Sequence, residues 1–403
     1  MLHRRLAIAG IAISVVLAFG VPDGARAEST LGDVDPKEIR DAKPGSILRM
    51  RPVASGWEYR AKVYHILFRS TGPKGEPIIV SGAIIVPLKP APKEGRPVVA
   101  WAHPTTGVVD DCAPTLRPDL PRRIPGLWDM IERGYIVAAT DYQGPGPPIV
   151  QPFLIGESEA RAVLDSVRAA GQLPGTNAQK RFAVWGHSQG GHAALFTGQL
   201  AASYAPELEL VGVAAAAPAT YLEQLFDADH RTSSGKTLTA MALLSWSKVF
   251  EIPLDSILAR DAHESFKEVA HDCIETILEL LEVDIAVQPL QHEEFLKANP
   301  TKVEPWASIM QRNSPGKAPA GAPVFIAQGT ADTVVSPHVT KKFVEHLCGN
   351  GTSVKFVAIE GAGHMFAARD SASKAVAWIA DRFRGHPAPS DCADQTKASL
   401  PAP

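Results

Sequence analysis

Short hydrophobic runs alternate with helical patterns along much of the chain. Segments 59–68 and 78–86 are rich in β-branched and aromatic residues and flank a Gly-Pro-Lys-Gly turn at 72–75, which predicts an antiparallel hairpin. Buried strands are then predicted at 97–102, 135–139, 182–185 and 210–216. Helices are predicted between them at 127–133, 158–170 and 188–204. This alternation is typical of a mostly parallel sheet with helices on both faces.

The alternation stops between residues 221 and 318, where helical spacing predominates and no strand is predicted. Residues 238–250 are largely apolar and 274–281 repeat with helix spacing, as in cap helices that pack together or cover a substrate. Strands resume at 324–327 and 354–359, with helices at 338–347 and 371–383. We therefore predict an α/β core, residues 28–220 and 319–403, interrupted by a helical cap at 221–318.

The two ends of the chain carry weaker structural signals. Residues 1–27 have a basic start at Arg4 and Arg5, an apolar run and an Ala-Arg-Ala motif, which predicts a secretory signal peptide cleaved before Glu28. The alternative, an uncleaved anchor, would need a longer apolar run. Residues 28–56 show little periodicity and predict no element. The tail after His386 is rich in Pro and Ala and should be loose unless Cys392 is tied down.

Composition narrows the class of protein. The chain has 403 residues, 45% hydrophobic and 21% charged, which excludes a disordered protein. Its formal charge is −3 and it has no basic block, so no nucleic-acid partner is expected. No later segment is apolar enough to span a membrane, so we expect no stable membrane anchor and only transient contact with a lipid interface. The protein is expected outside the cytoplasm, secreted or periplasmic.

Four cysteines, an even number, suggest two disulfides in an exported chain. They are Cys112, Cys273, Cys348 and Cys392. Three pairings are open from the sequence, and four free buried thiols are the alternative. Their spacing fits no zinc motif, so no metal is expected.

The strongest chemical signal is the sequence Gly-His-Ser-Gln-Gly at 186–190, which fits Gly-x-Ser-x-Gly between a predicted strand and a predicted helix. A serine on such a sharp turn is held with its hydroxyl exposed above the sheet. Gly186 and Gly190 are expected because a Cβ would collide with neighbouring backbone. The motif predicts that Ser188 is a nucleophile; the alternative is an ordinary helix N-cap.

A serine nucleophile needs a base and an orienting acid, which in this arrangement follow it on loops after later strands. Asp332 follows strand 324–327 and His364 follows strand 354–359, so we predict these two as acid and base. Among the 13 histidines, His187 and His192 lie too close to the serine in sequence and His338 begins a helix. The rival acids Glu360 and Asp370 do not follow the earlier strand.

The tetrahedral intermediate needs two backbone donors for its oxyanion. One is predicted to be the amide of Gln189, next after the nucleophile. The other is expected in the loop after strand 97–102, where Pro104 has no N–H. We predict the amide of Thr105, with Thr106 as the alternative.

These motifs, with Ala-Thr-Asp-Tyr at 139–142 and Gly-Glu-Ser-Glu-Ala at 156–160, resemble the secretory lipase family of α/β-hydrolases over most of the chain. The resemblance implies an α/β-hydrolase fold, an acyl-serine mechanism on carboxylic esters, no cofactor and a cap that holds the acyl chain. It also implies the disulfides Cys112–Cys273 and Cys348–Cys392. The family usually has Gly where this chain has Pro104, so the resemblance is weakest at the oxyanion loop.

The sequence thus predicts an exported lipase or esterase that acts on small-molecule or lipid esters. A peptidase or amidase on the same scaffold is one alternative, because the same three side chains serve both reactions. A catalytically silent binding module is the other, and the intact Ser188, Asp332 and His364 argue against it.

Overall fold

The computed structural model describes residues 31–54, 56, 59–144, 150–229, 232–260, 262–271, 273–274 and 295–395. The predicted signal at 1–27 lies outside these residues, and so does most of the helical pattern at 274–281.

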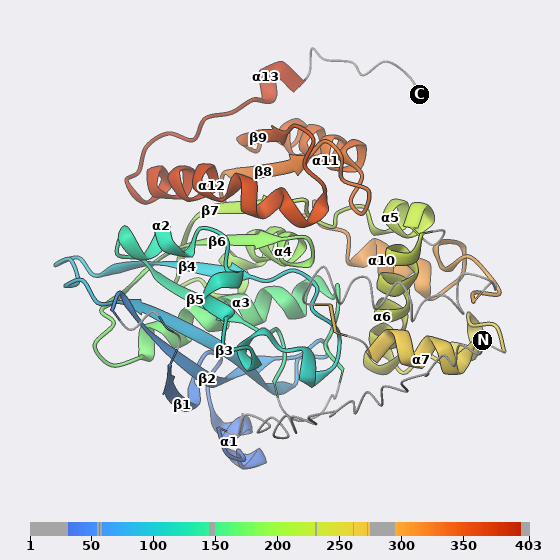
Figure 1. Ribbon diagram of the computed structural model, residues 1–403, viewed down its shortest axis with the longest axis horizontal. Coiled ribbons are helices and arrows are strands. Elements are labelled where there is room, and N and C mark those ends of the chain that lie inside the picture. Colours follow the sequence, from blue (N-terminus) through green and yellow to red (C-terminus); the bar gives the residue numbers. More distant parts are fainter. Residues whose placement is uncertain are drawn as a thin grey trace, which may run out of the picture. The chain divides into compact units, whose positions relative to one another are not determined.

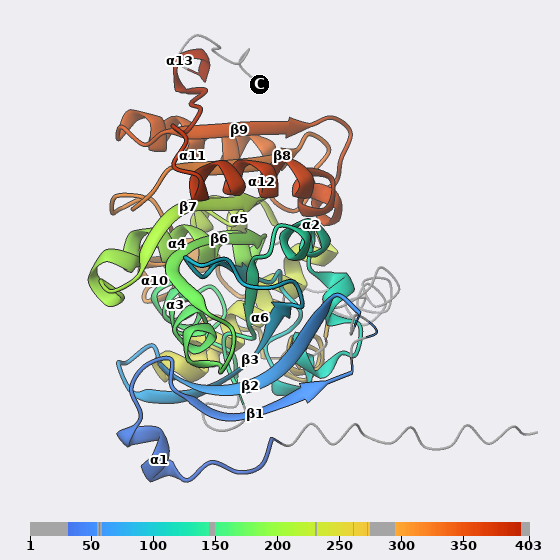
Figure 2. The same cartoon turned by 90° about the vertical axis from the view of Figure 1, so that its left-hand side faces the viewer.

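Nine strands form one sheet in the described part of the chain, in the order β1-β2-β3-β5-β4-β6-β7-β8-β9. They are β1 Ile47–Val53, β2 Ala61–Thr71, β3 Pro77–Pro87, β4 Arg96–Ala102, β5 Ile136–Thr140, β6 Ala178–His187, β7 Glu209–Ala216, β8 Val324–Gly329 and β9 Val354–Ile359. The β1–β2, β2–β3 and β3–β5 pairs are antiparallel, and the pairs from β5 to β9 are parallel. Figure 2 shows β9 at one end of the sheet and β1 at the other. The predicted hairpin and mostly parallel sheet are confirmed.

Helices cover both faces of this sheet (Figure 1). They are α1 Pro36–Asp41, α2 Leu127–Glu132, α3 Gly156–Gln172, α4 Gln189–Tyr204, α5 Leu222–Asp229, α6 Ser233–Phe250, α7 His263–His271, α10 Trp306–Arg312, α11 Pro337–Gly349, α12 Ala367–Phe383 and α13 Cys392–Gln395. Side chains of α3, α4 and α11 pack on one face with Phe182 and Val184 of β6. Those of α2 and α12 pack on the other face with Ala183 and Trp185. Both faces are therefore buried, which explains the continuous hydrophobic runs in the parallel strands.

Strand β1 and helix α1 lie where the sequence predicted no element, so that expectation was wrong. Strand β1 pairs only with β2 and forms an edge of the sheet. Its residues are half-buried or exposed except Leu48, and Arg49 and Arg51 interrupt its hydrophobic pattern. An exposed edge strand has little alternation to detect, and charged residues are common on such edges.

Between β7 and β8 the described chain is mainly helical, with α5, α6, α7 and α10 gathered together (Figure 1). An isolated bridge joins Leu258 and Leu296. The helices share a hydrophobic cluster that includes Trp246, Phe266 and Trp306. The cluster also takes in Phe153, from the loop before α3. The inserted segment thus has its own core and packs on loops at one end of the sheet.

The C-terminal tail is tied to the core. A disulfide joins Cys348, near the end of α11, to Cys392 at the start of α13. The Asp391 amide donates to the carbonyl of Val354, and the Asp391 side chain accepts from the amide of Phe356. Strand β9 thus holds the tail, which is anchored as far as the described residues extend.

The turn from β6 to α4 places Ser188 in a strained backbone conformation, with φ 55° and ψ −116°. Such conformations cost of order 1–3 kcal/mol and persist only where the surroundings enforce them. An added Cβ at Gly186 would lie 2.0 Å from the carbonyl oxygen of Gly190. At Gly190 it would lie 1.9 Å from the carbonyl oxygen of Ala102, at the end of β4. The turn therefore requires both glycines, as predicted.

We expect Gly190→Ala to abolish activity and to lower the free energy of unfolding sharply, because backbone rather than a flexible side chain would have to move. Gly171→Ala is the matched control, since a Cβ there meets no atom within 4 Å. Ala is favoured over Gly in helices, so Gly171→Ala should raise the free energy of unfolding by about 0.5–1 kcal/mol. Urea unfolding and ester turnover of the two variants measure the difference; equal effects would contradict this account of the turn.

Candidate active site

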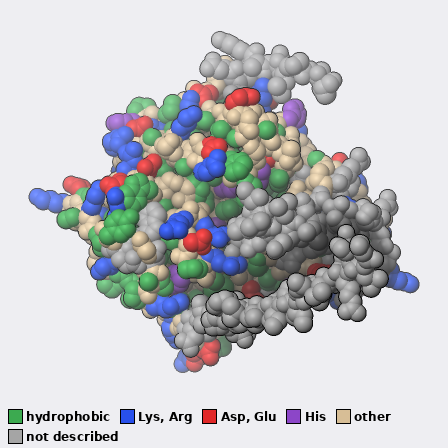
Figure 3. Space-filling model, viewed as in Figure 1, with side chains coloured by type: hydrophobic (Ala, Val, Ile, Leu, Met, Phe, Trp, Pro, Cys, Tyr) green, Lys and Arg blue, Asp and Glu red, His purple; other side chains and the backbone are tan. Residues whose placement is uncertain are grey.

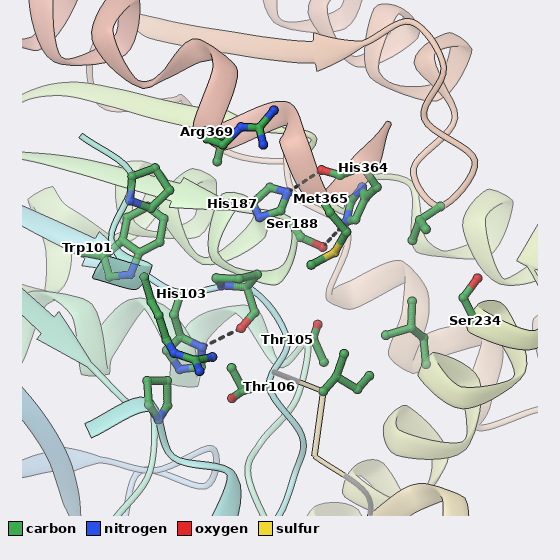
Figure 4. Close-up of a pocket in the computed structure, with 18 of the residues that line it drawn as sticks. Trp101, His103, Thr105, Thr106, His187, Ser188, Ser234, His364, Met365 and Arg369 are labelled. Carbon is green, nitrogen blue, oxygen red and sulfur yellow. Dashed lines mark hydrogen bonds between the residues drawn. The ribbon is translucent and has the colours of Figure 1, made fainter. Parts of the chain in front are cut away.

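Three predicted site residues meet at the carboxyl ends of parallel strands in the same half of the sheet. Ser188 directly follows β6, Asp332 lies in the loop after β8, and His364 lies in the loop after β9. In Figure 4 the side chains of Ser188 and His364 point toward one another. Ligands bind at this edge in open α/β sheets, so the position fits a reactive site.

The three side chains form a continuous hydrogen-bonded chain. His364 Nδ1 lies 2.9 Å from Asp332 Oδ2, and His364 Nε2 lies 2.8 Å from Ser188 Oγ. A carboxylate can only accept, so Nδ1 carries the proton and donates to Asp332. In the neutral ring Nε2 is then an acceptor, and the Ser188 hydroxyl donates to it. This tautomer is the one that a base needs in order to take the serine proton.

Asp332 is held in place from several directions. Its Oδ1 accepts from the amides of Val334 and Val335 at 2.9 and 2.8 Å, and its Oδ2 also accepts from Gln328 Nε2 at 2.9 Å. Burial acts to raise the pKa of this carboxyl, but the hydrogen bond and charge of His364 and the two amides outweigh burial and leave the pKa below its ordinary value. Asp332 therefore stays ionised while it orients His364.

His187, rejected as a base from its sequence position, contacts the site in another way. Its Nε2 donates to the backbone carbonyl of His364 at 3.0 Å, and the two rings lie 5.0 Å apart between centroids. Burial, aided by the charge of nearby His364, lowers the pKa of His187 to about 3. His187 is thus a neutral donor that fixes the His364 loop, and the Gly-x-Ser-x-Gly pattern gave no sign of this contact.

Backbone donors lie on both sides of Ser188. Gln189 is the first residue of α4, so its amide has no partner within the helix. Thr105 and Thr106 both line the cavity next to Ser188 (Figure 4). In the described part of the chain, neither threonine amide donates to another protein group. The structure therefore places Thr105 and Thr106 on the wall of the cavity beside Ser188, with the Gln189 amide directly after Ser188 in the chain, and leaves Thr106 as a rival donor.

Tyr142 supports the loop that contains these threonines. Its hydroxyl donates to the carbonyl of His103 at 2.9 Å, and the two rings lie 4.4 Å apart. Burial, with the charges of Glu159 and Asp141, raises the pKa of Tyr142 well above its ordinary value, so the hydroxyl stays a donor. His103 Nδ1 in turn donates to the carbonyl of Pro104. The Pro104 that departs from the usual Gly thus sits in a loop held by side-chain hydrogen bonds.

A cavity of about 550 Å³ opens beside Ser188. Its wall combines apolar residues of the sheet and its loops with Ser234 and Thr237 of α6, and the apolar ones include Trp101, Leu120, Pro125 and Met365. Pockets of about 300–1,000 Å³ are typical of small-molecule sites. The cavity is therefore large enough for a substrate whose reactive bond lies at Ser188.

A disulfide and a hydrogen bond connect this wall to the chain around Thr106 and Cys112. Cys112 is bonded to Cys273, and the adjacent Ile274 donates its amide to the carbonyl of Thr106 at 2.8 Å. Ile274 also lines the cavity. Both disulfides thus have the pairing that the family resemblance implies.

The rival residues and other kinds of site find less support. Asp370 accepts from Arg369 Nε, and neither it nor Glu360 or His338 lines the cavity.

Over the ranges that the structure describes, no group of three or more His, Cys, Asp or Glu could hold a metal ion. No helix within those ranges is long and apolar enough to cross a membrane. On the face in Figure 3, acidic and basic side chains are interspersed with hydrophobic ones.

Comparison with known proteins places this chain in a family. The sequence pattern of the family described as secretory lipase matches residues 126–391. Lipase 5 of Candida albicans is 27% identical, over 89% of this chain and 81% of that one. Candida antarctica lipase A has a similar structure, with a TM-score of 0.77 and 20% identity over 91% of this chain and 87% of that one. The rice cell wall degrading esterase LipA of Xanthomonas oryzae superposes with a TM-score of 0.69 and 18% identity, covering 85% and 98% of the two chains. The α/β-hydrolase fold is thereby confirmed, and the chain belongs to the secretory lipase family of carboxylic ester hydrolases.

Proposed function

We propose that this chain is an exported serine esterase or lipase that cleaves acyl esters through a covalent acyl-serine intermediate. The observation that carries the proposal is the hydrogen-bonded chain from Ser188 through His364 to Asp332 beside the cavity. Ser188 is the nucleophile, His364 the general base and acid, and Asp332 the orienting carboxylate.

In the first half of the reaction, Ser188 Oγ attacks the ester carbonyl carbon while its proton passes to His364 Nε2. Negative charge then builds on the former carbonyl oxygen, where the amides of Gln189 and Thr105 donate to it. Asp332 stabilises the imidazolium ring without taking its proton. When the intermediate collapses, His364 gives its proton to the departing alcohol and the acyl group remains on Ser188.

In the second half, water replaces the alcohol. His364 takes a proton from the water as its oxygen attacks the acyl carbon, and the same two amides hold the second oxyanion. Collapse of this intermediate returns the proton to Ser188 Oγ and releases the carboxylic acid. No cofactor or metal is needed in this sequence, because every proton moves between His364, Ser188, water and the substrate.

The cap and the export signal complete the proposal. We place the cap at residues 221–318, inserted in a core of 28–220 and 319–403, with α6 forming one wall of the acyl site. Ser234 and Thr237 of that helix line the cavity, which supports the assignment. Two disulfides and the family's description support export, to the periplasm or the medium. The substrate is a small-molecule or lipid ester.

We expect Ser188→Ala to lower kcat by about 10⁶-fold and Asp332→Asn by about 10⁴-fold, because the first removes the nucleophile and the second the tautomer that His364 needs. Turnover of p-nitrophenyl esters of several chain lengths measures both. Ser203→Ala in the exposed last turn of α4 and Glu360→Gln, the rival acid, are the controls and should stay within about threefold of wild type. Turnover by Ser188→Ala near the wild-type level would refute the mechanism.

A pair of proline variants tests the second oxyanion donor. Thr105→Pro removes the amide hydrogen that we assign to the oxyanion, and should lower kcat by about 100- to 1,000-fold with little change in KM. Thr106→Pro removes the amide hydrogen one residue later and should lower kcat much less. If Thr106→Pro is the more damaging variant, the donor is Thr106 and the assignment of Thr105 is wrong.

Export is tested by the mature N-terminus. Expression of the full chain in a bacterial host should yield extracytoplasmic protein that begins at Glu28, because cleavage follows the Ala-Arg-Ala motif at 25–27. Edman sequencing of that protein reads the start directly. Protein that retains residues 1–27 in the membrane fraction would instead indicate an uncleaved anchor.

A further inference from the structure

A second histidine–carboxylate pair lies behind the nucleophile, outside the proposed reaction. His192 is in the first turns of α4, and its backbone N–H donates to the carbonyl of Ser188 at 3.0 Å. Its Nδ1 lies 2.7 Å from Glu159 Oε2, and both side chains are completely buried. Its Nε2 lies 2.7 Å from the backbone carbonyl oxygen of Asn313. The pair thus joins α4, the start of α3 and the segment after α10.

The partners of His192 fix its proton count. A backbone carbonyl oxygen can only accept, so Nε2 must donate a proton to Asn313. An ionised carboxylate also only accepts, so Nδ1 must donate to Glu159. A neutral imidazole has one N–H and cannot satisfy both partners. The pair therefore holds one more proton than a neutral histidine beside a carboxylate.

The other contacts of Glu159 indicate where that proton lies. Its Oε1 accepts from the amide of Leu154 at 3.0 Å and from Gln189 Nε2 at 2.8 Å. Apart from His192, two N–H groups thus donate to this carboxyl group, and donors of this kind stabilise the ionised form. These two donors favour the arrangement in which the extra proton is on the ring rather than on the carboxyl group.

Gln189 links this pair to the reaction. Its side chain is held by Glu159, while its backbone amide is our proposed oxyanion donor. The side chain is buried, and no other hydrogen bond within the described residues reaches it. Since Gln189 begins α4, a fixed side chain also fixes the direction of its amide. Misplacement of a catalytic group by about 1 Å can cost about 100-fold in rate.

We propose that His192 and Glu159 hold the extra proton as an imidazolium–carboxylate pair, and that the pair positions Gln189 as the oxyanion donor. The inference rests on the proposed function, since it assigns Gln189 a place in the same site. Glu159 and His192 are positioning residues, because neither contacts the substrate. A buried ion pair of this kind does not by itself favour stability, which fits a role in holding geometry.

The protonation state can be measured on the wild-type protein without any assay of activity. Long-range ¹H–¹⁵N correlation spectra of protein labelled with ¹⁵N-histidine report each ring nitrogen, and His192→Gln or through-bond correlation assigns the signals. We expect both nitrogens of His192 to carry protons at pH 8, whereas His187 should show one. A neutral His192 ring, with one unprotonated nitrogen, would overturn the proposal.

Kinetics test the positioning role. Glu159→Gln removes the charge that holds His192 and Gln189, and should lower kcat by about 30- to 100-fold with KM changed by less than about threefold. Gln189→Met keeps the backbone amide and loses only the side-chain anchor, so it should reproduce this loss. Asp165→Asn is the matched control, because Asp165 is a buried, hydrogen-bonded carboxylate on the same helix α3 that contacts Ser70 and Tyr204 instead.

The outcomes separate the two proposals. Wild-type kcat in Glu159→Gln, or an equal loss in Asp165→Asn, would overturn the positioning role. If Glu159→Gln does not fold, the kcat of Gln189→Met still tests the positioning role, and the spectra of the wild-type protein still test the protonation of His192. Failure of the proposed function is recognised independently, because Ser188→Ala would then retain wild-type turnover whatever the state of His192.

Discussion

The site depends on the sharp turn that carries Ser188 between β6 and α4. Ser188 has a positive φ in this turn, and Gly190 packs so closely on the last carbonyl of β4 that no side chain would fit there. That contact fixes the end of β4 against the start of α4. The loop that contains Thr105 follows β4, and Gln189 is the first residue of α4. The spacing between the serine and the proposed oxyanion donors therefore follows from the packing of the two central strands.

Around this turn, each reactive group is held by a group that takes no part in the chemistry. Gln328 and two backbone amides hold Asp332, and His187 holds the backbone of His364. Tyr142 holds the carbonyl of His103 at the start of the loop that contains Thr105 and Thr106. Side chains fixed in this way cannot turn to other partners, so the donors and acceptors are in place before a substrate arrives.

Local sequence signals were enough to predict three side chains that meet in the structure, but not the groups that hold them. Ser188 could be predicted because its turn imposes a short motif, and Asp332 and His364 because each follows a strongly hydrophobic strand. The parallel strands were predictable because they are strongly hydrophobic. Strand β1 was not, because it is an edge strand interrupted by arginines. His187 contacts His364, and Glu159 contacts His192. Both contacts join segments that are distant in the sequence, so no spacing along the chain predicts them. The Gly-Glu-Ser-Glu-Ala motif marked the position of Glu159 without revealing its partner.

Several features that oppose folding are gathered in this one region. Ser188 has a strained backbone, Asp332 and Glu159 are buried carboxyl groups, and buried His187 is kept neutral. Each has a cost, but the hydrophobic clusters on both faces of the sheet lie directly beneath and keep the strands in register. The disulfide between Cys112 and Cys273 adds a covalent restraint next to the hydrogen bond from Ile274 to Thr106. Local sequence rules are broken here because the rigid sheet can support the strain, and the acyl transfer that we propose would require such rigid placement.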